Sequence, residues 1–227
     1  GLMMFAVATP VEKFASPRAW TRADLENDSS WIHPLSRQEI EDLEMGLRAV
    51  LATGKSEFEL SAADFPLTPA TDKLLKTIIQ STQSNYGVCL VRGFPVDKWT
   101  PAEMRTLFWS MGLRMGVPRP QGKPSHFVSN VRDDGGVYRS GTGRGYNTNS
   151  KLDFHSDGSD VVGLMCLQVA KSGGSSLISS SMSAFNELKK VRPDLAEVLQ
   201  QPLYFGRQGE QAAEEPAYYQ ASIVGFK

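Results

Sequence analysis

The stretch that decides the fold and the chemistry of this 227-residue sequence is Leu152-Asp153-Phe154-His155-Ser156-Asp157. Its pattern predicts a strand over residues 152–157. Side chains two apart on a strand project from the same face, about 7 Å from each other along the backbone. His155 and Asp157 can therefore hold one metal ion between an imidazole and a carboxylate. The triplet alone is weak evidence, because most strand histidines are ordinary surface or core residues.

The sequence around this stretch predicts helices first and strands later. Further strands are predicted at 88–91, 127–131, 161–169, 175–180, 203–205 and 218–224. Amphipathic helices with cap residues are predicted from Ser36 to Gly54, Thr68 to Gly87 and Thr100 to Gly116, and shorter ones over 184–200, interrupted near Pro193. This order favours helices packed outside a mainly antiparallel β core, in one domain covering residues 1–227.

Composition argues against nucleic acid and membranes as partners and indicates the compartment. Lys and Arg number 24 against 25 Asp and Glu, so no basic field would gather nucleic acid or anionic lipid. No apolar run approaches the roughly 20 residues of a membrane span. With only Cys89 and Cys166, the sequence predicts no disulfide framework, buried unpaired thiols and a reducing, cytoplasmic compartment.

A long loop is predicted over residues 133–150, rich in Gly, Asn, Ser and Thr, at the mouth of the sheet. Its alternating glycines lack the strand-turn-helix context of a dinucleotide site. The loop leads directly into the 152–157 strand. Its polar side chains Tyr146, Asn147 and Asn149 are therefore predicted substrate contacts.

Residues 146–160 resemble the iron-binding strand of the taurine dioxygenase-like (TauD/TfdA) family of Fe(II)- and 2-oxoglutarate-dependent oxygenases. The segment 170–176, with Gly173 and Gly174, looks like that family's "GG-x-T" turn. Similarity continues, in the family's order, at 87–95, 161–164, 186–188, 192–195 and 205–207. The ordered set covers most of the chain from about Trp31.

The resemblance implies an α+β, mainly β fold with a double-stranded β-helix (jelly roll) core and flanking N-terminal helices. It makes His155 and Asp157 ligands of Fe(II), and it suggests that Ser176, where the family more often has Thr, hydrogen-bonds 2-oxoglutarate. The implied enzyme is a dioxygenase that uses O2 to oxidise, by default hydroxylate, a C–H bond of a small polar substrate. The carboxylate of Asp157 argues against halogenation, whereas desaturation or ring closure stays open.

The sequence departs from the family pattern at the third ligand. The family places a second histidine ligand and an arginine for 2-oxoglutarate on late strands, yet no histidine follows His155 here. His126 and His33 lie upstream; His126 is predicted near substrate and His33 is treated as structural. Arg207 matches an earlier family arginine and is not the missing one. Only six or seven strands are found where a jelly roll needs about eight, which predicts a domain lacking its C-terminal strands.

Two other functions stay open at this point. A cupin-like metal hydrolase or isomerase would use the same histidine and carboxylate for zinc or manganese, without 2-oxoglutarate. A catalytically incomplete remnant would keep the fold and bind a ligand or a protein partner. The sequence leaves the substrate and homo-oligomerisation undecided.

Overall fold

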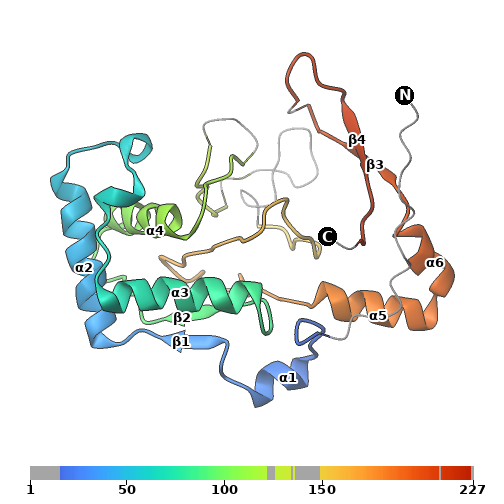
Figure 1. Ribbon diagram of the computed structural model, residues 1–227, viewed down its shortest axis with the longest axis horizontal. Coiled ribbons are helices and arrows are strands. Elements are labelled where there is room, and N and C mark those ends of the chain that lie inside the picture. The colour runs from blue at the N-terminus through green and yellow to red at the C-terminus, as the bar shows by residue number, and fades with distance from the viewer. Residues whose placement is uncertain (1–15, 122–125, 134, 136–148, 210, 226–227) are drawn as a thin grey trace. The chain divides into compact units, whose positions relative to one another are not determined.

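The computed structural model describes residues 16–121, 126–133, 135, 149–209 and 211–225. Internal contacts divide the chain into two compact units. Ser29–Ile178 is called the helical unit below, and Gly1–Asp28 with Ser179–Lys227 is called the hairpin unit. Figure 1 labels their helices and strands.

Three long helices of the helical unit begin at the predicted caps. At the start of α2 (Arg37–Ala52), the Ser36 hydroxyl accepts a hydrogen bond from the Glu39 backbone amide at 3.1 Å. The Glu39 carboxylate accepts one from the Ser36 backbone amide at 2.9 Å, which completes a capping box. α3 (Pro69–Gln83) begins after Thr68, and α4 (Pro101–Met115) begins after Thr100, each with a hydroxyl cap and proline in the first turn. The predicted helices are confirmed.

The core of the helical unit lies where α2, α3 and α4 pack on one another (Figure 1). Two short 3-10 turns, η1 (Glu57–Glu59) and η2 (Ala62–Asp64), lead to Phe65, whose side chain is buried against Gly46 of α2. Leu51, at the end of α2, is exposed. The buried apolar side chains of these three helices are Leu43, Leu47, Val50, Leu74, Leu75, Ile78, Met104, Leu107, Trp109 and Met111.

A short parallel strand pair accompanies these helices. β1 (Ile32–Pro34) pairs with β2 (Leu90–Arg92), with Ile32 opposite Leu90. The strand predicted at 88–91 therefore exists, displaced toward Arg92. β1 was not predicted, because three residues are too few to show a periodic pattern.

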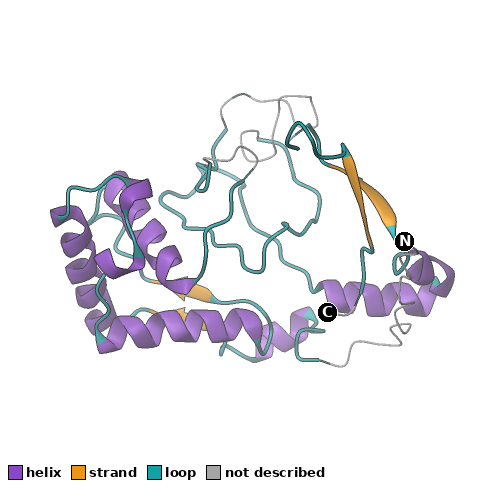
Figure 2. Ribbon diagram, turned by 45° about the horizontal axis from the view of Figure 1, so that its top comes forward, coloured by secondary structure: helices purple, strands orange, loops and turns teal. Residues whose placement is uncertain are grey.

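Four strand predictions are wrong for the described residues. The segments predicted at 127–131, 152–157, 161–169 and 175–180 contain no strand, and Figure 2 shows the described parts between α4 and α5 as loops. The physical reason is pairing: within the described part of the chain, strands pair only as β1 with β2 and β3 with β4, so these segments have no ladder partner. The described residues accordingly form no closed barrel. Several apolar side chains there are exposed, namely Phe154, Val162, Leu164, Val169, Leu177 and Ile178.

The hairpin unit contains α1 (Arg22–Asn27), α5 (Ser181–Val191), α6 (Pro193–Val198) and the antiparallel pair of β3 (Leu203–Gly206) with β4 (Tyr218–Ala221). Both short helices, their break at Pro193 and both strands were predicted and are confirmed. Its small core holds Phe185 and Ala196. Trp20 is also buried, and its carbonyl accepts the Ser183 hydroxyl at 2.7 Å.

Cys89 and Cys166 are both free thiols. Cys89 is half-buried, but Cys166 is exposed, so the prediction of buried thiols is wrong for Cys166. The exposure follows from its place in the unpaired segment 161–169. No helix in the described part of the chain has the length and apolar character that a membrane crossing requires.

Candidate metal-binding site

His155 and Asp157 lie close together without the strand that was predicted to align them. Nε2 of His155 is 4.0 Å from Oδ1 of Asp157, and the two side chains are 58% and 57% exposed. Nothing buries them in the described part of the helical unit. The structure therefore brings the side chains of His155 and Asp157 together, but a loop holds them where a strand was predicted.

A backbone hydrogen bond fixes the tautomer of His155. Its Nδ1 lies 2.7 Å from the carbonyl oxygen of Asp153. A carbonyl oxygen can only accept, so Nδ1 carries the hydrogen and the neutral ring keeps its lone pair on Nε2. In that neutral form Nε2, which lies 4.0 Å from Oδ1 of Asp157, is the nitrogen that a metal ion would bind. The sequence did not predict this partner of His155.

The pair fits a divalent iron ion in donor type and needs a small adjustment in distance. Imidazole with carboxylate is two thirds of the 2-His-1-carboxylate set that holds Fe(II). Two donor atoms that each lie about 2.1 Å from an ion, on adjacent coordination positions, are about 3 Å apart. Nε2 of His155 and Oδ1 of Asp157 would therefore have to approach each other by roughly 1 Å. Both side chains are more than half exposed, and rotation about their side-chain bonds can supply this approach.

No third ligand lies beside them within the part of the chain that the structure describes. Among the described residues, no group of three His, Cys, Asp or Glu side chains is arranged to hold a metal ion. His33 lies in β1, with Nε2 3.1 Å from both carboxylate oxygens of Glu39, so it joins β1 to the start of α2. This contact agrees with the structural role given to His33.

His126 lies in a short segment held by Gln121. The Gln121 amide donates to the His126 carbonyl at 2.6 Å, and Nε2 of its side chain donates to the Phe127 carbonyl at 2.8 Å. The His126 ring has Nε2 3.4 Å from the hydroxyl of Ser129. The imidazole is half-buried, and its nearest polar partner belongs to its own segment.

The other predicted contacts are placed only in part. Ser176 is exposed and follows Gly173 and Gly174, whose φ values of 71° and 74° make the turn that the sequence predicted there. Asn149 is exposed. Tyr146 and Asn147, with most of the predicted loop, lie outside the described residues.

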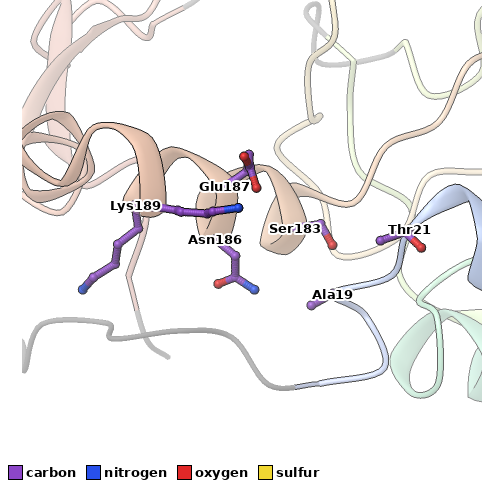
Figure 3. A pocket seen from close by; sticks show the side chains of 7 residues that line it. Ala19, Thr21, Ser183, Asn186, Glu187 and Lys189 are labelled. Atoms are coloured by element: carbon purple, nitrogen blue, oxygen red, sulfur yellow. The ribbon is translucent and has the colours of Figure 1, made fainter.

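A hollow of about 550 Å³ in the hairpin unit was not predicted from the sequence. Figure 3 shows that α5 and the segment preceding α1 supply the side chains around it. The sequence carried no signal for it, because its residues come from two distant segments and are ordinary surface types. They are Ala19, Thr21, Ser183, Asn186, Glu187, Lys189 and Lys190.

Comparison with known proteins gives a family and two relatives. The model of the family described as "Taurine catabolism dioxygenase TauD, TfdA family" matches residues 51–225. FR-33289 synthase of Streptomyces rubellomurinus is 30% identical over 208 residues, which cover 91% of this chain and 61% of that protein. Taurine hydroxylase-like protein SAT17 of Stachybotrys chartarum is 26% identical over 196 residues, covering 83% of this chain and 51% of that protein. The chain thus spans between half and two thirds of the length of these relatives.

Proposed function

Because this chain belongs to the TauD/TfdA family of dioxygenases, we propose that the whole protein oxidises a C–H bond of a small polar molecule, using Fe(II), 2-oxoglutarate and O2. Hydroxylation is the proposed outcome. The observation that carries the proposal is the geometry of His155: its Nδ1 lies 2.7 Å from the Asp153 carbonyl oxygen, and its Nε2 lies 4.0 Å from Oδ1 of Asp157. The pair therefore presents one neutral and one anionic donor to a single ion.

In this proposal the chain holds the metal through His155 and Asp157. Bound Fe(II) with 2-oxoglutarate would supply the activation of O2. The Ser176 hydroxyl can donate a hydrogen bond to a 2-oxoglutarate carboxylate. Asn149, with Tyr146, Asn147 and His126, is proposed to contact substrate. We assign the third iron ligand and the arginine for 2-oxoglutarate to polypeptide outside the 227 residues, since no histidine follows His155.

We also propose that residues 1–227 belong to a single jelly-roll domain. The exposed apolar side chains of segments 152–157, 161–169 and 175–180 support this, because a strand in such a core turns alternate apolar side chains to the interior. The two free thiols fit a reducing, cytoplasmic compartment. The names of the two relatives, a synthase and a taurine hydroxylase-like protein, support a small substrate without identifying it.

The test is an anaerobic titration of the complete protein with Fe(II) and 2-oxoglutarate, followed by visible absorption. We expect the weak charge-transfer band of the chelate to appear at one Fe(II) per chain. The 227-residue chain alone should bind more weakly, because two ligands hold an ion less tightly than three. No band in the complete protein, at saturating Fe(II), would overturn the proposal.

The non-catalytic alternative has one observation in its favour: no three-ligand cluster exists among the described residues. A remnant of this kind would bind 2-oxoglutarate or a related acid without Fe(II). Calorimetric titration with 2-oxoglutarate, with and without Fe(II), distinguishes the two functions. The oxygenase requires the metal for tight binding, whereas the remnant does not.

A further inference from the structure

One residue, Gln121, makes three hydrogen bonds to the segment from His126 to Ser129. Its backbone amide donates to the His126 carbonyl at 2.6 Å, and its side-chain Nε2 donates to the Phe127 carbonyl at 2.8 Å. Its side-chain Oε1 lies 3.2 Å from the hydroxyl of Ser129. The same hydroxyl lies 3.4 Å from Nε2 of His126, so Gln121, Ser129 and the imidazole form a short series of polar contacts.

The direction of each hydrogen bond in this series follows from the groups involved. A carbonyl oxygen can only accept, so the Gln121 side-chain atom beside the Phe127 carbonyl is the nitrogen, and the atom beside Ser129 is the oxygen. That oxygen also only accepts, so the single hydrogen of the Ser129 hydroxyl points to Gln121. The hydroxyl then offers His126 only a lone pair, which places a hydrogen on Nε2 of the ring. The reverse direction would leave two oxygens facing each other at 3.2 Å with no hydrogen between them.

The other ring nitrogen of His126 is left as an acceptor. In a neutral imidazole one nitrogen carries the hydrogen and the other a lone pair, so a hydrogen on Nε2 leaves the lone pair on Nδ1. Within the described part of the chain, this Nδ1 has no hydrogen-bond partner. The ring is half-buried, and its Nδ1 suits a donor such as a hydroxyl or an ammonium group.

The two residues between His126 and Ser129 are attached to α4. The ring of Phe127 lies 5.7 Å, between centroids, from that of Trp109, and the Arg105 guanidinium lies 3.4 Å from the Val128 carbonyl. Phe127 and Val128 also pack against the core of the helical unit. The imidazole and the hydroxyl that contacts it are therefore carried on a segment that this core holds.

We propose that Gln121, acting through Ser129, is a positioning residue that keeps the hydrogen of the His126 ring on Nε2 and presents Nδ1 as an acceptor. The inference rests on the proposed function for the role of His126 as a substrate contact. There, Nδ1 would accept a hydrogen bond from a hydroxyl or ammonium group of the substrate. The tautomer itself rests only on the contacts of Gln121 and Ser129.

The test is imidazole nitrogen NMR of the complete protein labelled with 15N-histidine, without metal or substrate, at a pH above which the ring resonances no longer move. His126→Gln identifies the two resonances by their loss. A fixed tautomer gives one nitrogen the shift of an N–H group and the other that of an unprotonated nitrogen, whereas exchanging tautomers average the two shifts. Because Gln121 is exposed, water competes for its hydrogen bonds, so the parent protein is itself a test. We expect separate shifts with the hydrogen on Nε2, and averaged shifts or a hydrogen on Nδ1 would overturn the inference.

Variants at Ser129 isolate the series of contacts, because they leave both bonds from Gln121 to backbone carbonyls in place. Ser129→Ala removes the acceptor of the Nε2 hydrogen, so the separation between the two nitrogen shifts should shrink. Ser129→Thr keeps the hydroxyl and should keep the parent shifts.

Gln121→Met tests the first member of the series. It frees the Ser129 hydroxyl to donate to Nε2, and the shifts should move toward a hydrogen on Nδ1. Parent shifts in both Gln121→Met and Ser129→Ala would exclude the positioning role.

These measurements are independent of iron. If the complete protein shows no charge-transfer band with Fe(II) and 2-oxoglutarate, the proposed function fails, and the ring shifts still decide what Gln121 does. If the band appears but the tautomers exchange, the proposed function stands and the role of Gln121 is wrong.

Discussion

At the scale of single residues, the His155 ring is oriented by the polypeptide next to it. The Asp153 carbonyl is two residues away, so the tautomer is set locally and does not wait for distant parts of the fold. Asp157 is also only two residues from His155, so its position beside the ring is set locally as well. In the proposed function, the pair would therefore form an incomplete, weak site without the third ligand.

The proposed role of Asp157 as an iron ligand predicts a large effect of its substitution on iron binding. In the complete protein, Asp157→Ala should weaken Fe(II) binding by more than the roughly 10- to 100-fold that loss of a supporting hydrogen bond costs a metal site, and should abolish coupled turnover. The measurement is Fe(II) content after dialysis, with 2-oxoglutarate consumption. His126→Ala is the comparison, and it should keep its iron. Full turnover by Asp157→Ala would exclude it as a ligand, and loss of iron from His126→Ala would make His126 one.

The closeness of the His155 and Asp157 side chains could be predicted from the sequence, but their surroundings could not. A His-x-Asp spacing within a recognisable motif is a local property of the chain. The hydrogen-bond partner of Nδ1 is a backbone carbonyl. Every residue has one, so the residue types in the sequence cannot show which carbonyl accepts this hydrogen bond.

At the scale of helices, two glycines test how tightly α2 and α4 are packed. A Cβ on Gly46 would lie 2.3 Å from Cε2 of the buried Phe65, whereas a Cβ on Gly112 meets nothing within 4 Å. We expect Gly46→Ala to lower the free energy of unfolding by about 1–3 kcal/mol through overpacking. Gly112→Ala should raise it by about 0.5–1 kcal/mol through helix propensity. Urea denaturation measures both, and stabilisation by Gly46→Ala would mean that Phe65 can move aside.

An ion-pair network joining α2 to α4 predicts a loss of stability in acid. Arg48 lies 2.9 Å from Glu103 and 3.1 Å from Glu44. Its hydrogen bond holds the pKa of Glu103 below the ordinary 4.5. Burial raises the pKa of Glu44, but hydrogen bonds from Trp99 and Arg48 outweigh it, so this pKa is also lowered. Carboxyls with depressed folded-state pKa values stabilise the protein above about pH 4.5, and this stability is lost as the pH falls through those lower values.

The measurement is the free energy of unfolding in urea between pH 7 and pH 3. It should be nearly constant down to about pH 5 and then fall, and Glu103→Gln should make the fall shallower. Glu197→Gln serves as the control, since Glu197 has no ion pair within the described part of the chain. An unchanged pH profile in Glu103→Gln would show that the network contributes nothing to stability.

Helices could be predicted well and strands poorly, for one physical reason. A helix satisfies its hydrogen bonds within itself, so Ser36, Thr68 and Thr100 mark their helices by local chemistry alone. A strand depends on a partner elsewhere in the chain. The pattern at 161–169 describes side chains suited to a sheet, but it cannot supply the neighbouring strand.

At the scale of the whole molecule, the core of the hairpin unit is small within its described residues. Its described buried apolar residues are Trp20, Phe185 and Ala196, against a much larger cluster in the helical unit. Isolated two-stranded hairpins such as β3 with β4 are marginal in water. We therefore expect the two units to unfold together, as the proposed single domain requires.

Tryptophan fluorescence tests this cooperativity. Of the four tryptophans, only Trp20 lies in the hairpin unit. A variant with Trp31, Trp99 and Trp109 changed to Phe keeps Trp20 as its one fluorescent tryptophan. Its urea unfolding midpoint measured by fluorescence should equal the midpoint measured on the same variant by far-UV circular dichroism. Trp20→Phe, which reports the helical unit, should show the same agreement. A Trp20 transition at lower urea than the circular dichroism would indicate two separately unfolding domains.

The contrast between the two thiols makes site-selective labelling practical. Burial raises the pKa of the Cys89 thiol, which keeps the reactive thiolate scarce, whereas Cys166 is open to solvent. A maleimide nitroxide would attach first at Cys166, nine positions beyond Asp157 and next to Met165. Paramagnetic broadening between that label and a bound manganese or cobalt ion would then report the separation of metal and segment in solution, without any change to the ligands.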